Sequence, residues 1–289
     1  MKPIIKTKLK KLLKNKTILV TGGAGSIGSE VTKKMLSFPV KSVRVLDIDE
    51  HALFKLRRVV KDSRLRLLLG SILDKDRLDL ASNDVDIIIH TAAIKNIEIS
   101  EYNPIETIDT NINGTVNLIK MVIKNKPKIF INISTDKAVS PSTLYGSTKQ
   151  LSEKLVGWAG NHIPSTNFST IRFGNVFESR GNVFEIWDEE KKNNKPLSIT
   201  DPKMKRYFIH VNEVVDFILE CMLISKKGLI FVPKMKSYKI KDLVSKISSK
   251  QKIVGIRSGE KVEEILLSDE ERKKATERGN MWIIETFDS

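Results

Sequence analysis

The segment Thr17–Gly28, which reads TILVTGGAGSIG, decides the fold class of this chain. It begins with a short β-rich run, and Gly22, Gly25 and Gly28 follow at regular spacing, with helix-compatible residues after them. Glycine at a strand–helix junction permits a tight turn, lets backbone N–H groups approach a pyrophosphate, and lets the helix pack close to the strand. The segment therefore predicts a dinucleotide-binding turn, provided that it opens a series of βαβ units.

The chain after this turn alternates between β-rich and helix-compatible segments. The β-rich runs cover residues 42–46, 64–69, 86–90 and 128–133, and the helix-compatible segments cover 29–37, 51–60 and 105–124. Alternation at this interval predicts repeated right-handed βαβ units. We therefore expect an α/β fold, with a Rossmann-type, doubly wound parallel sheet in residues 17–170.

The alternation weakens after about Ile171. The remaining short β-rich runs, at 195–200, 229–233 and 252–256, lie among longer connections. Residues 171–289 are therefore predicted to form mainly a smaller C-terminal substrate-binding domain, with some segments returning to the Rossmann-type core.

The composition is that of a globular protein. Of the 289 residues, 40% are hydrophobic and 29% are charged, which argues against disorder. No run approaches the ~18 apolar residues of a membrane span, and the first residues lack the apolar core of a signal peptide. The single Cys221 excludes an internal disulfide framework and a cysteine-based zinc site. We expect a cytoplasmic protein without a bound metal.

The net charge of +15 is unusual, and much of the excess lies in a basic leader, residues 1–16. Seven lysines there surround five isoleucine or leucine residues. The leader is predicted to be solvated and frayed; the alternative is an amphipathic helix in weak contact with anionic lipid. Nucleic acid is not an expected partner, because aromatic residues are few and are not interleaved with the basic ones.

Asp47 lies at the end of the second β-rich run, roughly twenty residues past the glycines. A carboxylate there can accept the ribose hydroxyls of NAD, and its charge would repel the extra phosphate of NADP. The alternative is a helix N-cap, because Asp47, Asp49 and Glu50 precede a helix. Arg44 is close enough in sequence to leave the choice between NAD and NADP open.

Tyr145 and Lys149 lie four residues apart in the segment YGSTK, which places them on one face of a helix. A tyrosine with a pKa of about 10 is a poor base at neutral pH. A neighbouring ammonium, together with the positive nicotinamide ring, would favour the phenolate. Tyr-x-x-x-Lys is common by chance, but here it follows the run 128–133 and the hydroxyl-rich segment Ser134–Lys137.

Further motifs follow the glycine turn. They are His90-Thr-Ala-Ala-Ile-Lys95, Glu101-Tyr-Asn-Pro104, Asn111, Ser134-Thr-Asp-Lys-Ala138, Arg172-Phe-Gly-Asn-Val176, Ser179-Arg-Gly181, Thr200-Asp-Pro202, Arg206 and Gly255-Ile-Arg-Ser-Gly-Glu-Lys261. With the Tyr145–Lys149 pair they resemble the polysaccharide-biosynthesis branch of the extended short-chain dehydrogenase/reductase superfamily. Soluble members of this branch include inverting UDP-N-acetylglucosamine 4,6-dehydratases, and the resemblance covers about residues 17–267.

The resemblance implies catalytic roles for four residues. Tyr145, supported by Lys149, would remove the proton from the sugar 4-hydroxyl during oxidation at carbon 4. Asp136 would act as acid and Lys137 as base in the loss of water between carbons 5 and 6. The base role requires a lowered pKa for Lys137. The NAD or NADP would stay tightly bound and be regenerated in each cycle.

The resemblance also implies two sets of binding residues in a homo-oligomeric enzyme. The cofactor set is Gly22, Gly25, Ser26, Ile27, Gly28, Asp47, Ser71, Ile72, Ala92, Ala93, Lys95, Tyr145 and Lys149. The UDP-sugar set is Lys95, Asn175, Leu197, Thr200, Arg206, Arg257 and Glu260. Arginine suits a diphosphate because its guanidinium donates two parallel hydrogen bonds; surface ion pairs are the alternative for both arginines.

Four positions depart from the family pattern. Glu178 stands in place of glycine, Glu185 in place of proline, and Asn96 and Glu263 in place of histidine. A carboxylate beside a diphosphate is unfavourable, so either Glu178 points away from the substrate or the substrate differs.

The sequence thus predicts a UDP-N-acetylglucosamine 4,6-dehydratase. A UDP-sugar 4-epimerase is the alternative, since it needs the Tyr–Lys pair but not the Asp136–Lys137 pair. A non-catalytic nucleotide-binding scaffold is the third possibility, and the complete set of catalytic residues argues against it.

Overall fold

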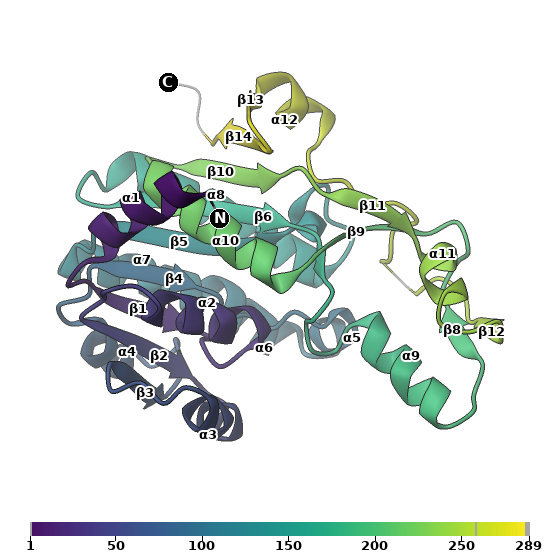
Figure 1. Cartoon of the computed structure of the whole chain (residues 1–289). Coiled ribbons are helices and arrows are strands. Elements are labelled where there is room, and N and C mark those ends of the chain that lie inside the picture. The colour runs from purple at the N-terminus through teal and green to yellow at the C-terminus, as the bar shows by residue number, and fades with distance from the viewer. Residues whose placement is uncertain (1, 258, 287–289) are drawn as a thin grey trace.

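The computed structural model describes residues 2–257 and 259–286, so Ser258 of the 255–261 motif and residues 287–289 lie outside the described part. A large twisted sheet forms the centre of the molecule (Figure 1). Its parallel strands, from one edge inward, are β3 (Leu65–Leu69), β2 (Ser42–Asp47), β1 (Thr17–Thr21), β4 (Ile87–His90), β5 (Ile129–Thr135), β6 (Asn167–Phe173) and β10 (Leu229–Pro233). Two antiparallel strands, β14 (Met281–Glu285) and β13 (Thr276–Arg278), complete the other edge.

The strand order reverses between β1 and β4, which makes this a doubly wound sheet. All residues of β1 and β4 are buried, as expected of parallel strands that are covered on both faces. The predicted α/β, Rossmann-type fold is confirmed. In such sheets the crevice for a ligand lies outside the carboxyl ends of the strands at the reversal point.

Helices cover both faces of the sheet. The first layer contains α1 (Pro3–Leu13), α2 (Ser26–Leu36), α3 (Glu50–Val59) and α10 (Val211–Ile224), whose buried residues share one hydrophobic cluster. The second layer contains α4 (Lys75–Ser82), α7 (Gly114–Asn125) and α8 (Leu144–His162), which share another. Figure 1 shows α2 and α10 in front of the sheet, with α7 behind it.

The sequence predicted one continuous helix at 105–124, and the structure shows that this prediction is wrong. The chain there forms α6 (Pro104–Ile108), one π-helical turn (Asp109–Asn113) and then α7. The turn directs Asn111 inward, where its amide donates to Ile94 O at 3.0 Å and accepts from Ile94 N at 2.9 Å. The same amide donates to Thr148 Oγ1 on α8 at 3.0 Å. The interruption therefore holds the loop after β4 against α8, a role typical of π-turns near functional sites.

A smaller lobe lies beside the carboxyl ends of the strands (Figure 1). It contains α9 (Val183–Lys192), α11 (Ile240–Ser245), a sheet of β7 (Asn175–Val176), β9 (Lys205–Ile209) and β11 (Lys236–Lys239), and the pair β8 (Leu197–Ile199) and β12 (Gln251–Ile253). Its core surrounds the buried Trp187, whose indole N–H donates to Ser198 O at 2.7 Å. The sequence assigned the run 229–233 to the smaller part of the molecule. In the structure this run is strand β10 of the large sheet, because its apolar side chains are buried there.

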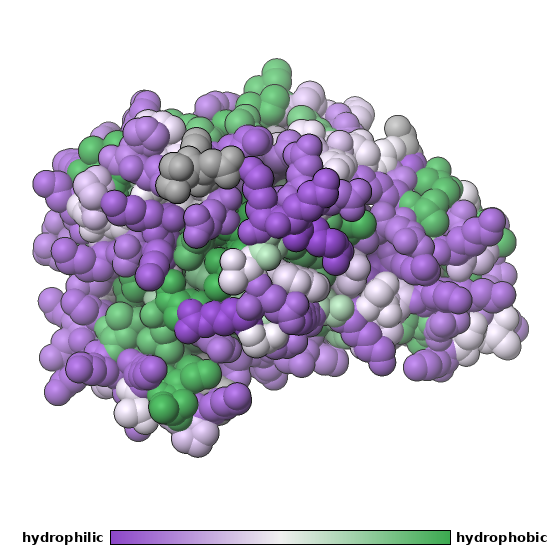
Figure 2. Space-filling view, turned by 90° about the horizontal axis from the view of Figure 1, so that it is seen from above, coloured by the Kyte–Doolittle hydropathy of each residue, from purple (hydrophilic) through white to green (hydrophobic). Residues whose placement is uncertain are grey.

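The basic leader is not a frayed segment, and that prediction is wrong. It forms α1, which packs on α10 with Leu9 and Leu13 fully buried. Burying each leucine contributes about 1.5–3 kcal/mol, which explains why a lysine-rich segment is ordered. The exposed lysines of α1 lie on the side of the helix that faces away from α10. Seen from above, one whole face of the molecule is covered mostly by hydrophilic side chains (Figure 2). In the described part of the chain, no helix combines the length and apolar character needed to cross a membrane.

We predict that Leu9→Ala destabilises the fold by about 2–5 kcal/mol, because it leaves a cavity under α1. The matched control is Ile4→Ala on the same helix, where the side chain is 65% exposed; we expect at most about 0.5 kcal/mol there. Urea unfolding of both variants measures the difference. Equal effects at the two positions would contradict the docking of α1.

Candidate active site

A cavity of about 890 Å³ opens at the carboxyl ends of the strands, with walls from both the large sheet and the smaller lobe. Most of the predicted site residues lie in its wall. These are Gly22, Gly25, Ser26, Ile27, Gly28, Asp47, Ser71, Ile72, Ala92, Ala93, Lys95, Lys137, Tyr145, Lys149, Asn175, Thr200, Arg206, Arg257 and Glu260. The volume is large enough for an extended ligand of the dinucleotide and nucleotide-sugar size class.

The glycine turn at the start of α2 forms one end of this cavity. Gly22 has a φ of +64°, and a Cβ on it would lie 2.6 Å from the backbone of Ala92. A Cβ on Gly28 would lie 2.4 Å from Gly22 O. No side chain fits at either position, so the turn brings backbone N–H groups at the N-terminus of α2 to the cavity. Such an arrangement suits a diphosphate, because these groups and the helix dipole both favour negative charge.

Asp47 stabilises this turn from the end of β2. Its Oδ2 accepts from Ala24 N at 2.9 Å, and its Oδ1 accepts from Asp49 N at 3.1 Å. The N-cap of α3 is Asp49, which accepts from Ala52 N. Asp49, and not Asp47, is therefore the N-cap residue of α3. Asp47 lines the cavity, and its contact with a ribose stays a prediction.

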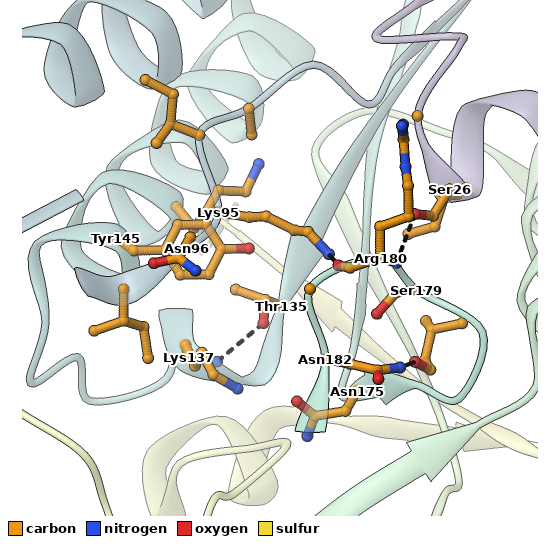
Figure 3. A pocket seen from close by; sticks show the side chains of 18 of the residues that line it. Ser26, Lys95, Asn96, Thr135, Lys137, Tyr145, Asn175, Ser179, Arg180 and Asn182 are labelled. Atoms are coloured by element: carbon orange, nitrogen blue, oxygen red, sulfur yellow. Dashed lines mark hydrogen bonds between the residues drawn. The ribbon is translucent and has the colours of Figure 1, made fainter. Parts of the chain in front are cut away.

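A strap formed by residues 179–182 crosses from the smaller lobe to the glycine turn. Arg180 N donates to Ser26 Oγ at 3.0 Å, and its carbonyl accepts from Lys95 Nζ at 2.7 Å (Figure 3). The Arg180 guanidinium donates to Ala24 O at 3.1 Å. Glu185 holds the strap from behind by accepting from Gly181 N. Arg180 had no role assigned from the sequence, although an arginine within Ser-Arg-Gly was a possible signal for an anion contact.

Tyr145 and Lys149 project from the first turns of α8 into the cavity. Thr143 caps this helix by accepting from Gly146 N at 3.1 Å. Burial raises the pKa of Tyr145 to about 12, against the opposing effect of the Lys137 charge. Burial lowers the pKa of Lys149 to about 8, with Glu153 opposing it. In this structure burial therefore keeps Tyr145 protonated, and the charge of Lys137 works in the opposite direction, toward the phenolate.

Lys137 lies in a cluster of charges at the end of β5. Its Nζ is 3.1 Å from Asp136 Oδ1 and 3.5 Å from Glu264 Oε1, while Arg206 Nε is 4.0 Å from the same Glu264 oxygen. Burial works to lower the pKa of Lys137, but the charges of Asp136 and Glu264 outweigh it and raise the pKa to about 12. The expected lowering of this pKa is therefore wrong for the structure as it stands, since two carboxylates stabilise the ammonium.

Asp136 lies behind Lys137 rather than in the cavity wall. Its side chain is fully buried, and Oδ1 accepts from Thr135 Oγ1 at 3.0 Å as well as from Lys137. Thr135 lines the cavity beside Tyr145, and its hydroxyl works to lower the pKa of the Tyr145 phenol. Hydrogen bonds to Lys137 and Thr135 therefore connect Asp136 to the cavity wall, so in this geometry a proton from Asp136 would reach a substrate through these residues.

Leu197 needs a correction among the predicted substrate contacts. Its side chain is fully buried beside Trp187 in the core of the smaller lobe and is not part of the cavity wall. The neighbouring Ser198 and Thr200 do line the cavity. Side chains alternate along a strand, so the segment can border the cavity while Leu197 points away from it.

The two arginines predicted to hold a diphosphate have protein partners in this structure. Arg257 Nε is 3.1 Å from Glu98 Oε1 at the rim. The guanidinium of Arg206 donates to the carbonyls of Lys205, Lys261 and Val262. Both side chains also line the cavity. The guanidinium groups that contact Glu98 and the backbone carbonyls here are therefore the same groups that are predicted to bind a diphosphate.

The unusual carboxylates point away from the cavity centre. Glu178 pairs with His210 Nδ1 at 2.6 Å and accepts from Val211 N at 2.9 Å, and it is not part of the cavity wall. Glu263 forms an exposed ion pair with Lys205 at 2.6 Å. Asn96 caps the short helix α5 (Ile97–Tyr102) by accepting from Ile99 N. Among the described residues, no group of His, Cys, Asp and Glu side chains is arranged to hold a metal ion.

His90 closes the floor of the site where β4 ends. Its Nδ1 lies 2.8 Å from Thr21 Oγ1 and its Nε2 lies 3.3 Å from Thr115 Oγ1. Burial, with a contribution from the charge of Lys149, lowers the pKa of His90 to about 3. The imidazole is therefore neutral and structural, and it ties β1, β4 and α7 together below the cavity.

The strand order, the glycine turn and the Tyr–Lys pair on α8 define the fold and site of an extended short-chain dehydrogenase/reductase. Within that class the chain belongs to the polysaccharide biosynthesis protein family, whose model matches residues 18–286.

Individual relatives agree with this assignment. An uncharacterized membrane protein of Methanocaldococcus jannaschii is 41% identical over 94% of this chain and 86% of its own. A UDP-N-acetylglucosamine 4,6-dehydratase (inverting) of Campylobacter jejuni is 38% identical over 94% of this chain and 84% of its own. A UDP-glucose 4-epimerase of Rickettsia bellii is 36% identical over 93% and 83%. The crystal structure of Pen from Bacillus thuringiensis superposes with a TM-score of 0.90 and 34% identity, over 94% of this chain and 90% of that chain. The curated relatives thus include both nucleotide-sugar dehydratases and epimerases.

We predict that acid weakens the fold through His90. The folded pKa of about 3 lies below the unfolded value of about 6.5, so between these values the unfolded state binds the proton and stability falls as the pH falls. The variant His90→Asn loses hydrogen bonds and is less stable at pH 7. It also lacks this linkage, so its deficit relative to the wild type should narrow by about 2 kcal/mol between pH 7 and pH 5. Denaturant unfolding at both pH values measures the deficit, and a deficit that does not change would contradict the linkage.

Proposed function

We propose that this chain is a nicotinamide-dinucleotide-dependent UDP-N-acetylglucosamine 4,6-dehydratase that inverts carbon 5. The observation that carries the proposal is the position of Lys137 beside Tyr145 in the wall of the cavity that also holds the glycine turn, with the buried Asp136 paired to Lys137 behind it. Oxidation at carbon 4 alone needs only Tyr145 and Lys149. A buried acid–base pair at this place supplies what the elimination of water additionally requires. The 38% identity to an inverting dehydratase supports the same substrate.

The residues at the glycine turn fit a dinucleotide. Gly22 and Gly28 leave no room for side chains, and the exposed N–H groups of α2 face a cavity that Asp47 also borders. When bound, the dinucleotide would accept a hydride from carbon 4 of the sugar and return it at carbon 6. Asp47 favours NAD over NADP, because its carboxylate would repel the additional phosphate.

The protein residues would manage the protons of the reaction. Tyr145 would take the proton of the 4-hydroxyl, and Lys149 would stabilise the phenolate that performs this step. The ketone at carbon 4 makes the hydrogen on carbon 5 acidic. Lys137 would first pass its proton to Asp136 Oδ1, which lies 3.1 Å from Nζ, and the free amine would then remove the hydrogen from carbon 5. The 6-hydroxyl would leave as water with the proton that Asp136 has received, relayed through the Thr135 hydroxyl.

A UDP-sugar 4-epimerase is the second candidate, favoured by the 36% identity to a UDP-glucose 4-epimerase. It would use Tyr145 and Lys149 in the same way. It has no use for a buried acid–base pair beside them, which is why we place it second.

A homo-oligomer is part of the proposal. Large apolar side chains are exposed on the helices of the second layer and on α5 and α6, among them Tyr102 (87% exposed), Ile105 and Trp158. A second copy of the chain would cover such a surface. We also propose that any contact of α1 with anionic lipid is weak and electrostatic, since Leu9 and Leu13 are already buried against the protein.

The first test of function is incubation of the purified protein and NAD with UDP-N-acetylglucosamine, followed by mass spectrometry and NMR. We expect a product that has lost one water and shows a new methyl signal. Lys137→Ala should abolish this product while dinucleotide binding persists; the control is Lys205→Ala, a half-exposed lysine of the smaller lobe that does not line the cavity. An isomer of unchanged mass would support the epimerase instead, and full activity of Lys137→Ala would remove Lys137 from the mechanism.

The second test concerns the strap. Arg180 places a guanidinium at the glycine turn, where a diphosphate would gain a charge-assisted hydrogen bond. Arg180→Ala should therefore weaken NAD binding about tenfold, as expected for the loss of one such bond. Calorimetric titration measures the affinity, with Lys191→Ala on α9 as a charge-matched control outside the cavity wall. Unchanged affinity in Arg180→Ala would show that the strap does not contact the ligand.

A further inference from the structure

Glu264 reaches the Lys137 cluster from a segment far along the chain. The segment runs beside β9, where Lys205 N donates to Val262 O at 2.9 Å and Lys205 and Glu263 form a parallel β-bridge. Arg206 adds two hydrogen bonds to the carbonyls of this segment. The backbone around Glu264 is therefore held firmly while successive side chains point to opposite sides: Glu263 to the surface and Glu264 to the cavity.

The carboxylate of Glu264 is buried and only partly satisfied. Its side chain is 5% exposed, Oε1 faces Lys137 Nζ at 3.5 Å, and Oε2 has no hydrogen-bond partner among the described residues. A buried carboxylate oxygen without a partner is costly. The protein tolerates this cost beside Tyr145 and Lys137, at the wall of the cavity, which indicates a role for the charge rather than for packing.

We propose that Glu264 is a positioning residue for Lys137: with Asp136 it holds the Lys137 ammonium at the cavity wall and sets the pH at which Lys137 can lose its proton. The proposal rests on the proposed function, in which Lys137 must become a free amine. Asp136 alone cannot orient the flexible lysine toward the cavity, because Asp136 lies behind it. Glu264 approaches from the other lobe, so the two carboxylates hold Nζ between them.

The charged and titratable groups around Lys137 come from five parts of the fold. They are Asp136 beside it on the turn after β5, Glu264 on the segment beside β9, Arg206 on β9, Lys95 on the loop after β4, and Tyr145 on α8. The two carboxylates favour the ammonium, whereas Arg206 and Lys95 favour the free amine. Removing one carboxylate at 3.5 Å should therefore allow Lys137 to deprotonate about 1–3 pH units lower.

The experiment measures the protonation of Lys137 directly. Trace acetylation of the full chain with acetic anhydride at pH 9, read by mass spectrometry of the Lys137 peptide, reports the fraction of free amine. Glu264→Gln keeps the shape of the side chain and removes its charge, and we expect Lys137 to be labelled at least about ten times faster than in the wild type. Glu263→Gln, next in sequence but on the surface, should leave the rate unchanged. Glu264→Asp keeps the charge at a longer distance from Lys137, so its labelling rate should lie between those of the wild type and Glu264→Gln. Exposed lysines in the same digest serve as internal standards.

Equal labelling of Lys137 in the wild type and in a folded Glu264→Gln variant would overturn the inference. If Glu264→Gln does not fold, as judged by circular dichroism, Glu264→Asp still decides: a longer gap between the charges should speed labelling measurably, and an unchanged rate would again overturn it.

A dehydration assay separates this inference from the proposed function. With Glu264→Gln, the acidic limb of the kcat profile should move to lower pH while KM stays near the wild-type value. Changed labelling without any dehydration in the wild type would reject the proposed function and keep the inference. Dehydration by the wild type, together with unchanged labelling of Lys137 in Glu264→Gln, would support the proposed function and reject the inference.

Discussion

A backbone contact at the first strand–helix turn is the constraint on which the rest of this structure depends. A side chain on Gly22 would collide with the backbone of Ala92, and one on Gly28 would collide with the carbonyl of Gly22. Because these positions carry none, β1, β4 and α2 converge where the strand order reverses. The cavity opens at that point. The hydrogen bonds of His90 with Thr21 and Thr115 hold β4 to β1 and α7 at the same place.

A second close approach brings Tyr145 and Lys137 together. A Cβ on Gly146 would lie 2.4 Å from Lys137 O, so the start of α8 packs directly on the turn after β5. This contact places Tyr145 and Lys137 on one wall. Glu264 then extends the charge cluster into the smaller lobe, so the ionisation of the site depends on how the two lobes meet. A buried cluster with balanced charges is stable only when all its members are present, which couples the chemistry of the site to the fold.

Prediction from the sequence succeeded where local pattern decides structure. The runs at 17–21 and 42–46 form β1 and most of β2, and the glycine turn lies where the pattern placed it. It failed where distant packing decides. The π-turn before α7 exists because Asn111 binds the loop at Ile94. The leader is ordered because α10 offers a surface for Leu9 and Leu13, which no local pattern contains.

The sequence by itself determined the α/β class, the glycine turn and the position of Tyr145 and Lys149 on one helix, because glycine sterics and helical spacing act over a few residues. Only the tertiary structure decided the charge state of the site. Burial raises the pKa of Tyr145, and Asp136 with Glu264 raises that of Lys137 against the effect of burial. Such energies depend on distance and desolvation between groups from separate parts of the chain, and neither quantity can be read from residue order.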